Sequence, residues 1–283
     1  MAIDEGRPLP ARVAWFREWR QRGGKLWLSI GRCTGAYVLR FPDHADFTIT
    51  TNPNLIVIRP AEVPQETLRH LLIDQVLPLA LSLQGRLILH ASAVHLPGIG
   101  AIGFVGESGR GKSTLAAALA ARGARVISDD SLAIDFKSGA PVAIPAYPGL
   151  RLWPGAAANP LLRASGDTRV AHYSRKRRVS PRALLFHRRR SPLRCVFLLS
   201  ARSSAGAPVS IRGCRARAGL IGMQRCTYLL DPDDRQILAG AFTALATLAT
   251  TVPVLRLRLR HGHRWLPEAA DLIRAYAAGV LTS

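Results

Sequence analysis

Apolar residues from about position 85 onward come in short runs, separated by glycines and charged turns. Two of these runs, 101–105 and 125–128, are predicted to be buried strands. The segment 112–121 between them is rich in alanine and leucine, which predicts a helix that ends at Gly123. A strand, a helix and a second strand in this order are typical of an α/β fold.

Later segments extend this prediction to a mixed sheet. The segments 132–136 and 142–144 flank a Lys-Ser-Gly turn and predict a hairpin, so the sheet is not purely parallel. Further strands are predicted at 87–94, 195–200 and 254–260. Further helices are predicted at 64–83 with a kink at Pro78, from an Asp231-Pro232 cap to about residue 250, and at 267–278.

The first 84 residues are predicted to form a small α+β unit of their own, followed by an α/β domain over residues 85–283. Residues 11–21 are expected to form a short helix with Trp15 and Trp19 on one face, which indicates core packing rather than a ligand site. Strands are predicted at 26–30, 36–41 and 55–58.

One stretch between the predicted strand 101–105 and its helix carries chemistry. Residues 106–114, GESGRGKST, match the phosphate-binding P-loop pattern G-x-x-x-x-G-K-[ST]. Glycines let backbone N–H groups turn toward phosphate oxygens, Lys112 reaches the β- and γ-phosphates, and the Ser113 hydroxyl binds Mg²⁺. The alternative is a glycine-rich turn that binds nothing. The predicted nucleotide-binding residues are Gly106, Glu107, Ser108, Gly109, Arg110, Gly111, Lys112, Ser113 and Thr114.

Two carboxylates, Asp129 and Asp130, end the strand that follows the P-loop helix. Ligands of α/β sheets gather at the carboxyl ends of strands, so both side chains are expected near the γ-phosphate. One, predicted to be Asp130, holds Mg²⁺ with Ser113, and the other accepts the proton of an attacking hydroxyl or orients a water. The alternative is a solvated Asp-Asp turn.

Composition narrows the partners only slightly. The net charge of +21 suits nucleic acid, a membrane surface or an acidic partner, but arginine is spread along the whole chain and no aromatic-plus-basic RNA motif or zinc finger is present. Nucleic-acid binding therefore ranks last. The basic segment 169–190 either clamps phosphate or an acidic peptide, or is a solvated loop. Four cysteines without C-x-x-C spacing, no apolar span and no signal core predict a cytoplasmic protein without a membrane partner.

The order HASAV, GFVGESGRGKST and RGARVISDDS resembles the catalytic domain of HPr kinase/phosphorylase, a P-loop fold related to phosphoenolpyruvate carboxykinase. The resemblance is good over residues 85–155. It implies a P-loop kinase core over residues 85–283, ATP and Mg²⁺ as cofactors, Asp129 as the base toward a serine hydroxyl, His90 as its support, and Lys112 on phosphate. It also suggests a homo-oligomer.

The departures point to a divergent, shorter branch of that family. Thr114 stands where the family usually has glutamate, YPGLRLWPG replaces the glycine-rich phosphorylase signature, and the metal-binding glutamate of that region has no clear match. Members of this branch resemble kinases that phosphorylate a serine of a ribosomal precursor peptide, notably in lasso-peptide pathways. The resemblance thus implies an ATP- and Mg-dependent serine kinase. The alternative is a P-loop ATPase or nucleotide-dependent switch without a phosphorylated acceptor.

Overall fold

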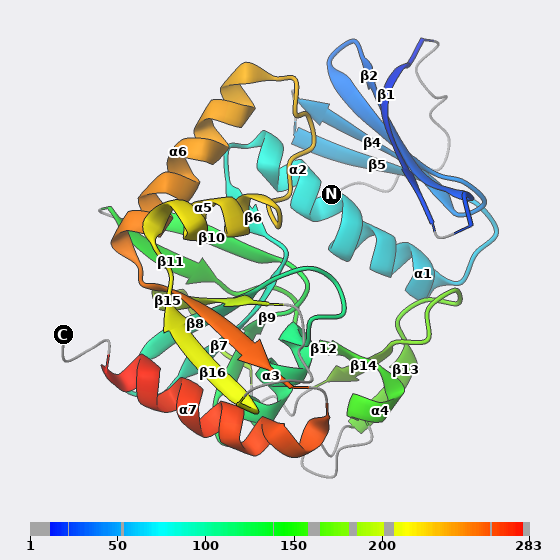
Figure 1. The fold of residues 1–283 in the computed structure, drawn as a ribbon. Coiled ribbons are helices and arrows are strands. Elements are labelled where there is room, and N and C mark those ends of the chain that lie inside the picture. The colour runs from blue at the N-terminus through cyan, green and yellow to red at the C-terminus, as the bar shows by residue number, and fades with distance from the viewer. Residues whose placement is uncertain are drawn as a thin grey trace. The chain divides into compact units, whose positions relative to one another are not determined.

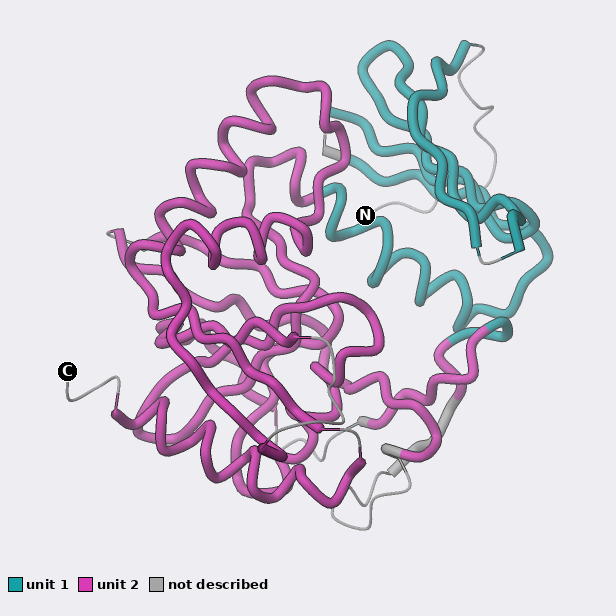
Figure 2. Tube along the Cα trace, viewed as in Figure 1, with its two compact units in different colours: residues 1–80, 171–173 teal, residues 81–170, 174–283 magenta. Residues whose placement is uncertain are grey.

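The computed structural model describes residues 12–21, 23–51, 54–137, 139–157, 165–180, 186–200, 207–260 and 262–279. The chain divides into two compact units, shown in Figure 2. Residues 1–80 and 171–173 form unit 1, and residues 81–170 and 174–283 form unit 2.

Unit 1 contains an antiparallel sheet in which each strand pairs with the next along the chain (Figure 1). The strands are β1 (Ala14–Arg20), β2 (Leu26–Cys33), β3 (Ala36–Phe41), β4 (Ala45–Thr51) and β5 (Asn54–Pro60). Alternate residues of β4, namely Ala45, Phe47 and Ile49, are buried, as one covered face of a sheet requires. The three strands predicted in this region are confirmed, and β4 was not predicted.

The helix predicted at residues 11–21 is wrong, because most of this segment is strand β1. Its aromatic side chains suit a half-exposed sheet surface, and pairing with β2 overrides the four-residue spacing of the tryptophans. Trp15 lies opposite Gly31, and Val13 with the Trp15 ring occupies the space that a side chain at Gly31 would fill.

A helical segment follows, made of α1 (Gln65–His70), the π-helical turn η1 (Leu71–Val76) and α2 (Leu77–Leu83). The predicted helix over 64–83 is confirmed, and its irregularity lies just before the proline rather than at it. Pro78 has no N–H for the carbonyl of Asp74, and the wider π turn accommodates that missing bond.

Unit 2 is built on a curled mixed sheet with strand order β6-β10-β11-β15-β8-β7-β9. Strand β17 also pairs with β15, and β16 pairs with β17. The strands are β6 (Leu87–Leu89), β7 (Ala91–Leu96), β8 (Gly100–Val105), β9 (Arg125–Ser128), β10 (Leu132–Lys137), β11 (Ala140–Ile144), β15 (Ser191–Leu199), β16 (Val209–Gly213) and β17 (Val254–Leu259). Strand β7 runs antiparallel to both β8 and β9, so these two strands point the same way and end at the same edge of the sheet.

Residues of each central strand alternate between two hydrophobic cores. In β8, Ile102 and Phe104 face the core covered by α3 (Lys112–Ala120) and α7 (Leu266–Gly279). Ala101 and Val105 face the opposite core, which includes residues of α6 (Arg235–Thr251). The sheet is therefore sandwiched between helices on both faces (Figure 1).

A small three-stranded sheet, in the order β12-β14-β13, accompanies the main sheet in unit 2. Its strands are β12 (Leu150–Leu152), β13 (Ser165–Arg169) and β14 (Arg177–Ser180), and the remaining helices of unit 2 are α4 (Pro154–Ala157), α5 (Ala216–Gln224) and the 3₁₀ turn η4 (His263–Trp265). None of these elements was predicted from the sequence.

Two boundaries in unit 2 differ from the predictions. The strand expected at 87–94 is two strands, because the chain exchanges its partner β10 for β8 and β9 at His90. The Asp231-Pro232 cap is wrong. Asp234 caps α6 instead, and its carboxylate accepts hydrogen bonds from the backbone N–H groups of residues 236 and 237.

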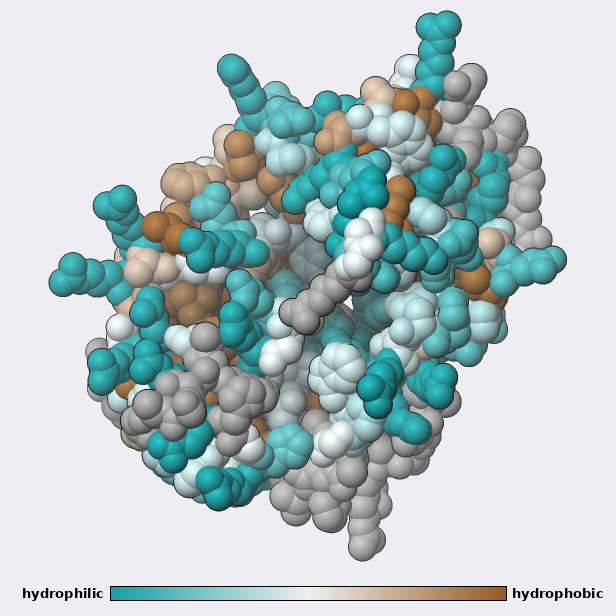
Figure 3. Space-filling view, turned by 45° about the vertical axis from the view of Figure 1, so that its right-hand side comes forward, coloured by the Kyte–Doolittle hydropathy of each residue, from teal (hydrophilic) through white to brown (hydrophobic). Residues whose placement is uncertain are grey.

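The other predicted strands and helices of unit 2, including the hairpin of β10 and β11, are confirmed with shifts of a few residues at some ends. In the described part of the chain, no helix is both long and apolar enough to cross a membrane. On the face drawn in Figure 3, hydrophilic residues surround smaller groups of hydrophobic ones.

Candidate nucleotide-binding site

The loop after β8 has the backbone of a phosphate cradle. Gly109 and Gly111 take positive φ angles of 82° and 103°, a conformation that other residues adopt only with strain. Gly111 is the N-cap of α3, so the loop runs directly into the start of a nine-residue helix. The backbone N–H groups of the first helical turn have no partner within the helix, and together with the helix dipole they favour an anion at this end.

The Lys112 side chain folds back over this loop. Its ammonium donates hydrogen bonds to the carbonyls of Gly106 at 2.6 Å and Glu107 at 3.0 Å. The residue is only 5% exposed, and burial lowers the pKa of its amine, while the charges of Asp130 and Asp129 oppose this change. A cation held inside the loop, beside carboxylates, is available to a phosphate that enters the loop.

Asp129 is buried behind the pocket, at 3% exposure. One carboxylate oxygen accepts a 2.5 Å hydrogen bond from the Ser92 hydroxyl, and the other accepts a 2.7 Å bond from the backbone N–H of Arg151. Burial, and next the neighbouring charge of Asp130, raise the pKa of Asp129. This carboxyl group therefore holds a proton more readily than a solvated aspartate does.

Asp130 has the opposite electrostatic setting. Its backbone is left-handed, with φ of 64°, a conformation that ordinary strand residues do not adopt. Burial by itself would raise the pKa of Asp130, but the nearby cations Lys176, Arg151 and Lys112 together lower it. Arg151 forms an ion pair with this carboxylate, with 3.7 Å between its Nε and Oδ2. Asp130 is therefore an ionised carboxylate.

His90 supports the backbone of Asp130. Its Nδ1 lies 2.9 Å from the Asp130 carbonyl, which only accepts hydrogen bonds, so the proton is on Nδ1. The Tyr228 hydroxyl lies 3.5 Å from the same carbonyl. Burial and the charge of Lys112 lower the pKa of His90, which favours the neutral ring. His90, expected to support Asp129, is thus hydrogen-bonded to Asp130, and the Ser92 hydroxyl instead donates to the carboxylate of Asp129.

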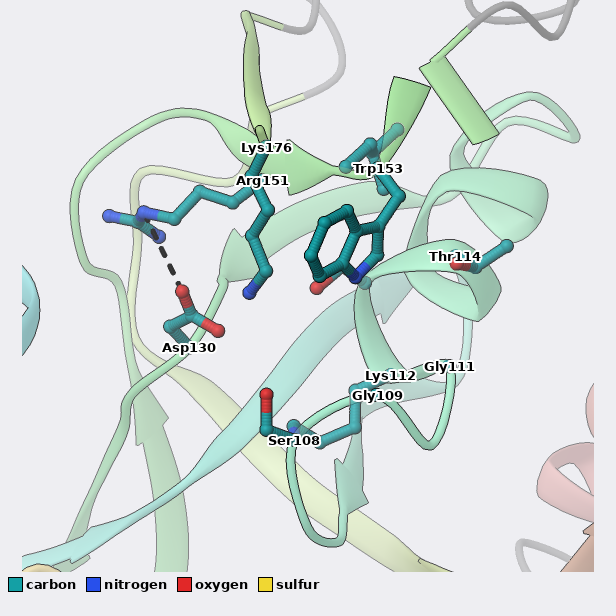
Figure 4. A pocket seen from close by; sticks show the side chains of 11 residues that line it. Ser108, Gly109, Gly111, Lys112, Thr114, Asp130, Arg151, Trp153 and Lys176 are labelled. Carbon is teal, nitrogen blue, oxygen red and sulfur yellow. Dashed lines mark ion pairs between the residues drawn. The ribbon is translucent and has the colours of Figure 1, made fainter. Parts of the chain in front are cut away.

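These groups surround a pocket at the shared edge of β8 and β9. It holds about 410 Å³ of empty space, counting the space open to solvent at its mouth. In Figure 4, Lys176 and Trp153 extend toward the loop across this space, and the Arg151 guanidinium is paired with Asp130 at one side. The lining residues are Ser108, Gly109, Gly111, Lys112, Ser113, Thr114, Asp130, Arg151, Leu152, Trp153 and Lys176.

The structure brings together most of the predicted site residues. Six residues of the P-loop and Asp130 line this pocket, and Asp129 and His90 lie directly behind it. The other three loop residues, Gly106, Glu107 and Arg110, line a different cavity.

Sequence reasoning gave no role to Ser92, Arg151, Trp153 or Tyr228 in this site. Ser92 is fully buried, and a hydroxyl within the otherwise apolar segment LILHASAV was a usable signal. Arg151 is 4% exposed, and its guanidinium donates to the Asp129 carbonyl at 3.0 Å. An arginine within YPGLRLWPG gave no hint of this contact, because β12 reaches the site only through the fold.

The pocket provides oxygen ligands of the type that Mg²⁺ prefers, namely the Ser113 hydroxyl and the Asp130 carboxylate. It also provides the cations Lys112, Arg151 and Lys176 for phosphate oxygens. Hydroxyl, carboxylate and cation in one cradle fit a metal-bound polyphosphate.

No protein-family model matches the chain, and no curated protein is similar to it in sequence. Among solved structures, the chain is similar to the Hpr(Ser) kinase/phosphatase from Coxiella burnetii, with 11% sequence identity and a TM-score of 0.36. The similarity covers 68% of this chain and 97% of that one. Similarity at this level is distant, and the residues of the site, not this likeness, indicate the chemistry.

Proposed function

We propose that the chain is a kinase that transfers the γ-phosphate of a Mg-bound nucleoside triphosphate, ATP, to a serine hydroxyl of a protein or peptide. One observation carries this proposal: the P-loop and the Asp129-Asp130 pair meet at one edge of the sheet, with Lys112 and Asp130 in the same pocket. Phosphoryl transfer depends mainly on positioning and charge, which this pocket supplies.

Each residue has a distinct part in this proposal. Lys112, Arg151 and Lys176 hold phosphate oxygens and balance the charge that develops on them. Asp130 and Ser113 would hold Mg²⁺, which when bound shields and aligns the phosphates. His90 is a positioning residue, because it fixes the backbone from which the Asp130 carboxylate projects.

Asp129 is the proposed acceptor of the serine proton. Its raised pKa is the direction that a base working near neutral pH needs. Its two hydrogen bonds fix the carboxylate, and the bond from Ser92 orients the oxygen nearest β7. Opening one of these bonds gives a hydroxyl access to the buried group.

We further propose that the acceptor is a serine of a ribosomal precursor peptide, and a lasso-peptide precursor is the first candidate to test. Incubation of the chain with Mg-ATP and candidate peptides should add one phosphate to the peptide, measured by mass spectrometry. Lys112→Ala and Asp129→Asn should each lower transfer at least about a hundredfold, as loss of a charge-stabilising group or a general base does.

Two results would change the assignment. ATP hydrolysis that depends on Lys112 but gives no phosphorylated peptide indicates an ATPase or switch. Transfer that survives Asp129→Asn but is lost in Asp130→Asn moves the base to Asp130.

A further inference from the structure

A second cavity lies on the other side of the P-loop. It holds about 640 Å³ of empty space, again counting space open to solvent. Its walls come from the P-loop, the carboxyl end of β15, helix α5 and β17. The cations that line it are Arg110, Arg225 and Arg256.

Packing of α5 places one of these arginines. Helix α5 lies close on the sheet because Gly219 faces Val254 and Gly222 faces Leu198, where a Cβ would come within 3.1 and 2.6 Å of the facing side chain. This close approach brings the end of the helix, and with it Arg225, to the wall of the cavity next to the loop.

Charge in this cavity is unbalanced. Arg110 pairs with Glu107 at 2.5 Å, so these two charges cancel. Within the described residues, the guanidinium groups of Arg225 and Arg256 form no hydrogen bond or ion pair, although both backbones are hydrogen-bonded. Burial raises the pKa of the Cys226 thiol, which therefore adds no negative charge.

The cationic surface continues along the sheet. Arg256 lies directly opposite Arg212 in the pairing of β16 with β17, and Arg258 follows on the same face of β17. Like charges at directly opposite positions destabilise a sheet. These three arginines have no carboxylate partner within the described residues, so this face of the sheet attracts anions toward the cavity that Arg256 lines.

We propose that this cavity is a second anion-binding site, in which Arg225 and Arg256 bind an oxyanion such as a carboxylate or a phosphate. A neutral nucleoside can stack on a guanidinium but leaves both positive charges unbalanced, whereas an oxyanion balances them and accepts a bidentate pair from each.

The cavity is also connected to the catalytic residues. Cys226 lines it, and the Cys226 carbonyl accepts a 2.6 Å hydrogen bond from the backbone N–H of His90. Two residues further on, the Tyr228 hydroxyl lies 3.4 Å from the His90 ring. A ligand bound in the cavity therefore lies next to Cys226, which is hydrogen-bonded to His90, and His90 in turn is hydrogen-bonded to the Asp130 carbonyl. We assign the oxyanion to an acidic side chain of the acceptor peptide. This assignment, unlike the anion site itself, rests on the proposed function.

The test titrates inorganic phosphate into the full chain by calorimetry at low ionic strength. Two classes of site are expected, one lost in Lys112→Ala and the other in the double variant Arg225→Gln/Arg256→Gln. The second class should weaken at least about tenfold, as loss of charge-assisted hydrogen bonds predicts. Arg217→Gln, on the exposed side of α5 and outside the cavity, is the control and should keep both classes.

Further arms separate the sources of the anion. If a serine-free peptide of aspartate and glutamate displaces phosphate only from the second class, the anion is an acidic side chain of the acceptor peptide. If phosphate binds there and the peptide does not displace it, the ligand is a small phosphate compound and the assignment to the peptide is wrong. Unchanged phosphate binding in the double variant, equal loss in Arg217→Gln, or Arg225- and Arg256-dependent binding of adenosine would overturn the proposal. If the parent chain shows only the class that depends on Arg225 and Arg256, and none that depends on Lys112, the proposed function is contradicted while the second site stands.

Discussion

Adjacent aspartates in this site have opposite protonation preferences. Asp129 is enclosed by Ser92 and the backbone of Arg151, and burial disfavours its charge. Asp130 faces the cations of the pocket, and those cations favour its charge. Environments that push two neighbouring pKa values apart are a common basis for dividing roles between two carboxylates.

This difference predicts opposite effects on stability. A group with a raised folded pKa contributes stability at low pH that is lost as the pH rises through that pKa, so Asp129→Asn should raise the melting temperature at pH 8, with the gain fading toward pH 4. A group with a lowered folded pKa contributes stability above its unfolded pKa, so Asp130→Asn should lower the melting temperature at pH 8, with the loss fading as the pH falls below about 4.

Thermal denaturation of both variants and the parent chain from pH 4 to 8 measures these effects. Asparagine keeps the shape of each side chain and tolerates the left-handed backbone of Asp130, so each variant is the matched control for the other. Changes of the same sign at pH 8 would contradict the separate environments.

At the scale of elements, α5 depends on two small residues that let it lie on the sheet. A Cβ at Gly219 would come within 3.1 to 3.3 Å of three atoms of Val254, a buried β-branched residue that cannot rotate aside. Gly219→Ala should therefore destabilise the protein by about 1 to 3 kcal/mol. Gly240, in α6, has nothing within 4 Å of its Cβ position, so Gly240→Ala should stabilise by about 0.5 to 1 kcal/mol.

Denaturant unfolding of the two variants checks this difference in sign. Equal effects of the two substitutions would show that helix propensity, not contact with Val254, decides the outcome. Loss of the second class of phosphate site in Gly219→Ala, with a folded chain, would further connect the packing of α5 to the position of Arg225.

Elements were predictable where local pattern and fold agree. The strand, glycine loop and helix at 100–120 follow from apolar runs, alanine content and left-handed glycines, which are all local. Strand β1 was missed because a tertiary partner, β2, decides its conformation. The break at His90 was missed because both halves of the segment are buried, and only the change of pairing partners separates them.

In the site, too, the features set by local sequence were predictable and those set by tertiary contacts were not. The loop and the aspartate pair were predicted from a motif and from the rule that ligands lie at strand ends, and the structure brings them to one edge. Whether each residue has its predicted catalytic role stays a prediction. Arg151, Tyr228 and the cavity with Arg225 come from segments distant in sequence, and no local pattern carries that information.

For the whole molecule, the net charge of +21 is a background against which any specific anion site must be distinguished. Long-range attraction between exposed charges is screened within about 10 Å at 0.1 M salt, whereas contacts inside a backbone cradle are screened much less. Mg-ATP at a hundredfold excess over its dissociation constant should stabilise the folded chain by about 2.7 kcal/mol. For a chain of this size, that raises the melting temperature by roughly 5 °C.

Most of this increase should persist between 50 and 300 mM KCl and disappear in Lys112→Ala. Binding of a random DNA duplex should instead fall by orders of magnitude over the same range and survive Lys112→Ala, because it depends on many weak phosphate contacts. Adenosine, which lacks phosphates, is the control and should leave the melting temperature unchanged. If ATP and DNA lose their effects in parallel as salt rises, nucleotide binding reflects the net charge of the protein and not the P-loop.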